Sequence, residues 1–375
     1  MKRVRFFYFL NSTKKNGVKL LLKIFNFLCE VKPKNKLSVL FEKHKYLKIY
    51  LSNTLEDNMK NRYGFGENAP GNNSVSNFTS ATIKNIVKTI PFRVLSAEDF
   101  EFWQHNGFVI IRNAVCIEDV TATAALLWEF QEMDPYDSSS WYRPQLRQNS
   151  MEELNNSGMV ECYNNQLLWN NRQNPRIYEA FVDIWDQEDL WVTIDRANLN
   201  PPNRHGRDFS GFIHWDADTS LTPLPVNVQG VLALSDTTLE TGGFQCVPSL
   251  YRDLENWILR QPTERDPFVP DLNGYETEFV AMKAGELLIW NCLLPHGVRA
   301  NKSETVRLAQ YISMVPAEEQ NEVILDWRIQ SWRERIPPEG FAFPGDPRKW
   351  EQTRYSKAKL SNLGEKLLGS QSWGI

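Results

Sequence analysis

The sequence predicts a mainly β domain with flanking helices, an α+β arrangement. Short runs rich in β-branched and aromatic residues recur between residues 190 and 315, separated by Gly, Pro and Asn. Their spacing is typical of a β-sandwich or barrel. Helical patterns precede and follow this region. With 375 residues, 42% of them hydrophobic and 23% charged, the chain has the composition of a globular protein with a sizeable core.

The first ninety residues differ from the rest, and we predict a separate extension over residues 1–90. Residues 1–50 carry thirteen Lys and Arg against two Glu, although the whole chain has a net charge of −4. Residues 18–31 predict a basic amphipathic helix that is too short and too charged to span a bilayer. We favour packing of this helix on the protein over weak contact with a membrane surface. Residues 58–80, rich in Asn, Gly and Ser, predict a polar linker.

The main domain is predicted over residues 91–318 and begins with helices. Ser96 and Asp99 form a capping-box pattern, which starts a helix that stops near Gly107. The elements predicted next are a strand at 108–115, a helix at 117–133 and a helical region at 159–185 that is broken at Pro175.

The β-rich region follows and is predicted to build the sheets. Its strands are expected at 190–199, 211–216, 228–235, 242–247, 279–282, 286–291 and 306–315. A helix is expected at 251–260, and residues 319–375 predict a helical tail packed on the domain.

One stretch of this region carries the residue types of a metal site. Side chains alternate along a strand, so His214 and Asp216 should point the same way. They supply two-thirds of the 2-His-1-carboxylate set that holds non-haem iron(II). The pair alone is weak, because a His-x-Asp arises by chance in about one sequence in four of this composition. His296, expected at a turn, offers a third ligand, and Arg307 on the next strand offers a planar cation suited to a dicarboxylate.

The order His214-x-Asp216, His296 and Arg307 resembles the pattern of iron(II)/2-oxoglutarate dioxygenases, and among them the phytanoyl-CoA dioxygenase family. The likeness covers about residues 95–317. It extends to Phe102–Ile110, Gly242–Ser249 and Gly285–Trp290. One departure is that Pro248-Ser249-Leu250-Tyr251 replaces the family's usual Pro-Gly-Ser-His, which leaves the ligand residues untouched.

The resemblance implies a double-stranded β-helix, the jelly roll of cupin-like proteins, with iron at one mouth. It implies that His214, Asp216 and His296 bind Fe(II) and are the catalytic set, and that 2-oxoglutarate and O2 are co-substrates. The expected reaction is hydroxylation of a small molecule with release of succinate and CO2. Because Asp216 is present, halogenation is not expected. Asp218 is a rival ligand by alternation, but the family spacing favours Asp216.

Further site residues are expected around this centre. Asn198 and Gln229 are candidates for binding 2-oxoglutarate, although a structural hydrogen bond explains Asn198 equally well. The candidates for contact with substrate are Arg196, Trp169, Arg172 and Trp290, of which Trp290 fits the core as well as the pocket.

Composition limits the expected binding partners and the expected cellular location. A net charge of −4 argues against a nucleic-acid partner and leaves a small-molecule substrate as the expected ligand. Five scattered cysteines without a CxxC pair favour free thiols and a cytoplasmic protein. The alternative function is a non-catalytic jelly-roll protein that binds or senses a metal. The oligomeric state and the substrate are left open by the sequence.

Overall fold

The computed structural model describes residues 83–143, 158–209, 211–338 and 345–374. All of them belong to one of the two compact units of the chain, residues 57–375. The predicted basic helix at 18–31 and the linker at 58–80 lie outside the described residues.

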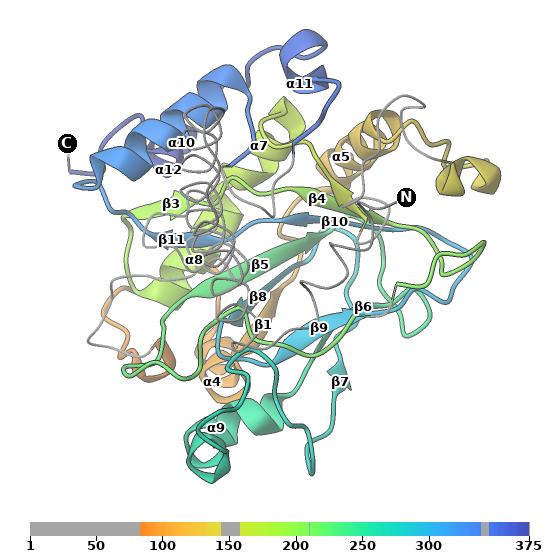
Figure 1. Cartoon of the computed structure of the whole chain (residues 1–375). Helices are drawn as coiled ribbons and strands as arrows, with labels where there is room; N and C mark the ends of the chain where they lie inside the picture. The colour runs from red at the N-terminus through yellow and green to blue at the C-terminus, as the bar shows by residue number, and fades with distance from the viewer. Residues whose placement is uncertain (1–82, 144–157, 210, 339–344, 375) are drawn as a thin grey trace, which may run out of the picture. The chain divides into compact units, whose positions relative to one another are not determined.

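The largest sheet has six strands, and every neighbouring pair runs antiparallel. In spatial order the strands are β1 (Phe108–Ile111), β8 (Leu287–Asn291), β5 (Val228–Ala233), β10 (Arg307–Tyr311), β4 (Ala197–Asn200) and β2 (Met159–Val160). A three-stranded sheet is formed by β7 (Glu278–Phe279), β6 (Gly243–Cys246) and β9 (His296–Arg299). The predicted β-sheet domain with flanking helices is therefore confirmed, and the structure shows its sheets to be antiparallel (Figure 1).

Two predicted strands are each divided in the structure. The first becomes β3 (Leu190–Val192) and β4, and the last becomes β10 and β11 (Met314–Pro316), with β3 and β11 forming a separate two-stranded sheet. Val192 pairs with Met314 whereas Ala197 pairs with Gln310. The backbone therefore advances five residues between these pairs on the β3–β4 side but only four on the β10–β11 side. One extra residue on the β3–β4 side makes this a β-bulge, which bends the strand and redirects its side chains.

The helices begin and end largely where local signals predict. Ser96 caps α4 (Ala97–Asn106) in a reciprocal capping box with Asp99, as predicted. Pro175 is the first residue of α8 (Pro175–Trp185), a position that Pro favours, so the predicted break in the helical region falls just before it. The remaining helices are η1 (Ile83–Asn85), α5 (Ile117–Phe130), η2 (Ser138–Tyr142), α7 (Gln166–Arg172), α9 (Pro248–Arg260), α10 (Glu322–Glu334), α11 (Trp350–Thr353) and α12 (Asn362–Leu368).

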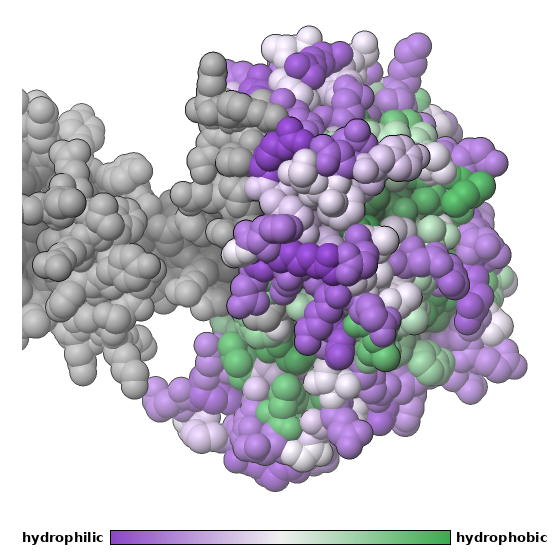
Figure 2. Space-filling model, turned by 90° about the vertical axis from the view of Figure 1, so that its right-hand side faces the viewer, coloured by the Kyte–Doolittle hydropathy of each residue, from purple (hydrophilic) through white to green (hydrophobic). Residues whose placement is uncertain are grey.

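The large sheet separates two hydrophobic clusters, and strand β8 shows this division. Leu287 and Ile289 belong to the cluster that includes α5, α7, α8 and the C-terminal helices, while Leu288 and Trp290 belong to the cluster with α9 and the three-stranded sheet. Alternation along a strand produces this division. The face seen in Figure 2 is mostly hydrophilic, with hydrophobic side chains in limited groups, because most of them are used in these clusters.

The C-terminal helices are attached to the sheets through a buried arginine. Arg328 of α10 donates to the carbonyl oxygen of Val192 at 2.6 Å and to those of Leu367 and Leu368 at 2.9 and 3.0 Å. Figure 1 shows α10 and α12 beside β3. Every helix in the described ranges is too short or too polar to cross a lipid bilayer.

Candidate metal centre

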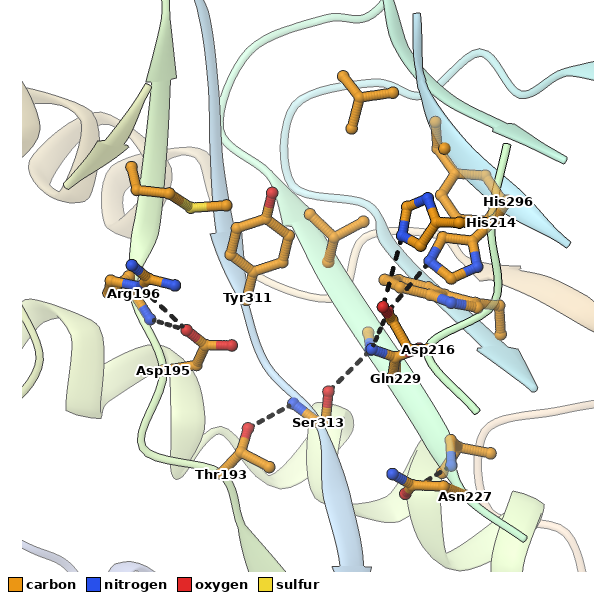
Figure 3. Close-up of a pocket in the computed structure, with 18 of the residues that line it drawn as sticks. Thr193, Asp195, Arg196, His214, Asp216, Asn227, Gln229, His296, Tyr311 and Ser313 are labelled. Carbon is orange, nitrogen blue, oxygen red and sulfur yellow. Dashed lines mark hydrogen bonds and ion pairs between the residues drawn. The ribbon is translucent and has the colours of Figure 1, made fainter. Parts of the chain in front are cut away.

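A cavity of about 280 Å³ opens between the large sheet and the three-stranded sheet. Its walls come from strands β2, β5, β6, β8, β9 and β10, from the residues between β3 and β4, and from the segment around His214. The inward face of the large sheet is the one that carries Trp290, so the alternation that builds the second cluster also directs side chains into the cavity. Figure 3 labels most of its polar residues.

The segment around His214 is held against β9 at very short range. It was predicted as a strand, but it makes a single antiparallel bridge, in which His214 and His296 exchange backbone hydrogen bonds of 2.8 and 2.9 Å. Glycines permit this approach, since a Cβ at Gly211 would lie 2.0 Å from the oxygen of Val298 and one at Gly297 would lie 2.3 Å from that of Phe212. His296 is the first residue of β9, and the turn predicted there comes before it.

Three potential ligand side chains meet at this bridge. Their ligand atoms lie within 4.8 Å of one another, and each histidine Nε2 is 3.4 Å from an oxygen of Asp216. Two ligands at right angles and about 2.1 Å from a metal are about 3.0 Å apart, so small adjustments would admit an ion. The Nδ1 atoms face the carbonyl oxygens of Phe212 at 3.1 Å and Leu294 at 3.0 Å. A carbonyl acceptor fixes the proton on Nδ1 and leaves the Nε2 lone pair directed inward, which is the arrangement a metal requires.

The charges of this cluster favour an ionised carboxylate. Burial raises the pKa of Asp216, but hydrogen bonds and charge from His214 and His296 outweigh burial and hold it well below its usual value. Burial likewise lowers the pKa of His214, yet the interaction with Asp216 leaves it raised. The amide of Gln229 donates to Oδ2 of Asp216 at 2.8 Å and so orients the carboxylate. Gln229, predicted to bind the co-substrate, is thus placed beside the metal cluster.

Aromatic rings form the wall behind His296. The ring of Phe244 stacks on that of His296 at 5.6 Å with 12° between the planes, and the ring of Trp290 lies 5.1 Å away. Trp290 is only 4% exposed and lines the cavity, so it belongs both to the core and to the site wall. These contacts restrict the imidazole to one orientation.

Arg307 is a buried cation on the inner face of β10. It is 5% exposed, lines the cavity and donates from Nη2 to Oδ1 of Asn198 at 2.9 Å. Within the described part of the chain no carboxylate lies within ion-pair distance of it, and its buried Nε has no hydrogen-bond partner. Burial lowers the pKa of Arg307, against a smaller opposing effect of Tyr311. A buried guanidinium without a counter-ion is suited to an anionic ligand.

The other predicted residues are placed differently. Arg196 lines the cavity, whereas Asn198 does not and contacts Arg307, which does. Trp169 and Arg172 do not line it. Trp169 is fully buried and donates to Asn164 at 3.1 Å, and Arg172 donates to the carbonyl oxygens of Tyr163 and Asp195. Both are core side chains, because α7 turns them toward the large hydrophobic cluster.

Tyr311 and Asp195 line the cavity but were not among the predicted site residues, and the sequence indicates the place of Tyr311 more clearly than that of Asp195. Tyr311 lines the cavity and lies on the face of β10 that carries Arg307, as alternation along the strand would indicate. Asp195 also lines the cavity, but its direction is set by the bulge, for which the sequence carries no evident signal. Asp218 lies outside the cluster and accepts hydrogen bonds from Ser220 within its own turn.

Comparisons with known proteins agree with this geometry. Residues 103–309, more than half of the chain, match the model of the family described as Phytanoyl-CoA dioxygenase (PhyH). A protein of Dictyostelium discoideum, provisionally named a phytanoyl-CoA dioxygenase, is 24% identical over an alignment of 271 residues, and the match covers 60% of this chain and 76% of that protein.

Two solved structures share the fold. Hypothetical protein JW0805 from Escherichia coli superposes with a TM-score of 0.53 at 15% identity and covers 73% of this chain and 81% of that one. GlcNAc Inducible Gene 2 (GIG2) from Candida albicans has a TM-score of 0.52 at 16% identity and covers 72% and 75%.

Proposed function

The chain belongs to the phytanoyl-CoA dioxygenase (PhyH) family, and we propose that it is an iron(II)- and 2-oxoglutarate-dependent dioxygenase that hydroxylates a small molecule. In this reaction one atom of O2 enters the carboxylate of succinate as 2-oxoglutarate loses CO2. The other atom becomes the hydroxyl oxygen inserted into a C–H bond of the substrate. Every atom and electron is thereby accounted for without a further reductant.

The metal would be held by His214, Asp216 and His296. Their Nε2 and carboxylate atoms converge, and the facial arrangement of two imidazoles and one carboxylate is the set that non-haem iron(II) oxygenases use. Bound iron(II) would supply the redox chemistry that couples loss of CO2 to oxidation of the substrate. Gln229 orients the carboxylate, and the carbonyl oxygens of Phe212 and Leu294 orient the imidazoles.

The observation that carries the proposal is the unpaired guanidinium of Arg307 in the same cavity. A dicarboxylate that reached from the metal to Arg307 would provide the counter-ion that the folded chain lacks among its described residues. A protein that only binds or senses a metal has no need of such a group. We therefore favour a dioxygenase over the non-catalytic alternative.

We also propose that the two facing sheets form a double-stranded β-helix. The six-stranded and three-stranded antiparallel sheets enclose the cavity between them, which supports this assignment. On this proposal residues 91–318 are the catalytic domain and residues 319–375 a tail packed on it. A cytoplasmic location stays a prediction.

The test is formation of the ternary complex and its turnover. The protein, loaded anaerobically with iron(II), should develop a visible absorption band when 2-oxoglutarate is added, and should yield succinate when O2 is admitted. His214→Ala and His296→Ala should lose both signals, because each removes a ligand. His105→Ala, an exposed histidine on α4, is the matched control. Absence of both the band and succinate from the unmutated protein would refute the proposal.

A further inference from the structure

The cavity has a second polar wall that the metal and co-substrate would not use. Figure 3 shows Asp195 and Arg196 on the side away from the histidines, with Tyr311 between the two groups. Both residues belong to the β-bulge between β3 and β4, and the backbone N–H of Tyr311 donates to the carbonyl of Arg196 at 3.0 Å. Bulges near active sites commonly redirect a side chain, and this one brings a carboxylate to the cavity.

The positive charge of Arg196 is already engaged. Its Nη1 donates to Oε1 of Glu161 at 3.0 Å, and the Glu161 side chain is 1% exposed behind the wall. Glu161 also accepts from the hydroxyl of Tyr163 and from the backbone N–H of Gly345. Nε of Arg196 lies 3.5 Å from Oδ1 of Asp195. One guanidinium therefore stands between two carboxylates, and this trio carries a net charge of −1.

One carboxylate oxygen is left for a ligand. Oδ1 of Asp195 accepts the backbone N–H of Arg196 at 2.6 Å, whereas Oδ2 accepts no hydrogen bond among the described residues. Figure 3 shows Oδ2 directed into the cavity. The Asp195 side chain is 23% exposed, so it is partly removed from water. An ionised oxygen in such a position gains from a hydrogen-bond donor, and most from a charged one.

The remaining charges of the cavity oppose an anionic substrate. Arg196 is paired with Glu161, and Arg307 would be taken by the co-substrate under the proposed function. The other walls include Val231, Val298 and Trp290, which suit a short hydrocarbon portion. At about 280 Å³ the cavity is near the lower end of the range for ligand pockets, roughly 300–1,000 Å³, and it must also hold the co-substrate. The substrate should therefore be small.

We propose that Asp195 anchors the substrate through a protonated amino group, so that the substrate class is small amines. This inference rests on the proposed dioxygenase function. The ammonium would donate to Oδ2 of Asp195, and the carbon chain would extend past Tyr311 toward the metal cluster. Asp195 thereby selects the substrate and fixes which C–H bond is presented.

The test measures binding, not turnover. The full chain is loaded with Mn(II) and 2-oxoglutarate and titrated by calorimetry with hexylamine and benzylamine, and with hexanol, benzyl alcohol, hexanoate and benzoate as counterparts of equal size. The amines should bind at least about tenfold more tightly than the alcohols, as expected for a charge-assisted hydrogen bond. The carboxylates should bind more weakly than the alcohols.

Substitution of Asp195 decides whether this carboxylate is responsible. Asp195→Asn keeps an oxygen to accept the Arg196 backbone amide but removes the charge, so the preference for amines should fall to about twofold or less. Asp326→Asn, an exposed acid on α10, is the control and should retain the preference. Unfolding in urea checks that both variants fold.

The two proposals fail separately. If amines bind no better than alcohols, or if Asp195→Asn keeps the preference, the substrate assignment is wrong even when succinate is formed. If amines bind selectively but the iron-loaded protein gives neither the absorption band with 2-oxoglutarate nor succinate, the assignment of Asp195 stands and the dioxygenase proposal is wrong.

Discussion

Replacing Arg307 by Met should change the free protein and its complex with 2-oxoglutarate in opposite directions. In the free protein Arg307 is 5% exposed, its buried Nε has no hydrogen-bond partner, and burial lowers its pKa. A methionine of similar length removes a buried charge without a counter-ion. In the complex the same change removes one of the two arginines that line the cavity among the described residues.

The two effects differ in size. Replacing a buried ion pair by hydrophobic side chains is often neutral or stabilises proteins by about 1–4 kcal/mol, and Arg307 lacks the counter-ion that would offset its burial. The side-chain oxygen of Asn198 would lose the N–H that it accepts, which costs about 1–3 kcal/mol. The free energy of unfolding of the free protein should therefore rise by only about 1 kcal/mol. Two charge-assisted hydrogen bonds to a carboxylate together contribute about 3–4 kcal/mol. The Kd for 2-oxoglutarate should therefore rise roughly 200- to 1,000-fold.

Both quantities are measurable without catalysis. Calorimetry with Mn(II)-loaded protein gives the Kd for 2-oxoglutarate, and urea unfolding of the metal-free protein gives the stability. Arg299→Met, at an exposed position on β9, is the matched control and should leave the Kd unchanged. If Arg307→Met altered the Kd by less than about threefold, the guanidinium would not bind the co-substrate.

Three further substitutions test other parts of the structure. Gly297→Ala would place a Cβ 2.3 Å from the carbonyl oxygen of Phe212 and force the ligand-bearing segments apart. The affinity for Mn(II) should therefore fall about tenfold or more in an equilibrium titration, and an unchanged affinity would contradict this. Ser96→Ala removes the cap of α4 and should lower the free energy of unfolding in urea by about 1 kcal/mol, and no loss would mean that the cap is dispensable. Burial raises the pKa of Glu351 from 4.5 to about 7, so the folded state holds this proton more tightly than the unfolded chain does. The resulting stability is fully present below pH 4.5 and is lost, by about 3 kcal/mol, as the pH rises to about 7. Glu351→Gln should flatten this pH dependence, whereas exposed Glu365→Gln should preserve it.

Local signals predicted the elements whose causes are local. The capping box of Ser96 and Asp99 places the start of α4, because its hydrogen bonds are made within four residues. The cores of β5, β6 and β8 lie inside their predicted runs. The bulge was missed because neither Thr193–Arg196 nor Ile312–Ser313 contains Gly or Pro, and it depends on pairing between distant strands.

The site likewise combines features that local sequence patterns predict and features that depend on contacts between distant segments. Alternation predicted that His214 and Asp216 face one way, and the structure places them beside His296. No pattern within the sequence indicates that Gly211 lies against Val298 and Gly297 against Phe212. Trp169 was expected at the substrate mouth, but packing decides which side of a short helix is covered, and α7 buries it. Leu167 and Leu168 before it and Asn170 and Asn171 after it give no clear apolar face that would show this.

Arg328 has a consequence for how the protein unfolds. Its guanidinium, with a pKa lowered to about 9 by burial, is satisfied by the carbonyl oxygens of Val192, Leu367 and Leu368. Separation of α12 from α10 would cost Arg328 two acceptors, and separation of α10 from β3 would cost it the third, so either event leaves a buried cation with too few partners. The helices after β11 and the β3–β11 sheet are thus thermodynamically coupled, and β3 leads through the bulge to Asp195. Local opening of the C-terminal helices would therefore disturb the cavity wall, so hydrogen exchange at β3 should occur only with opening of α12.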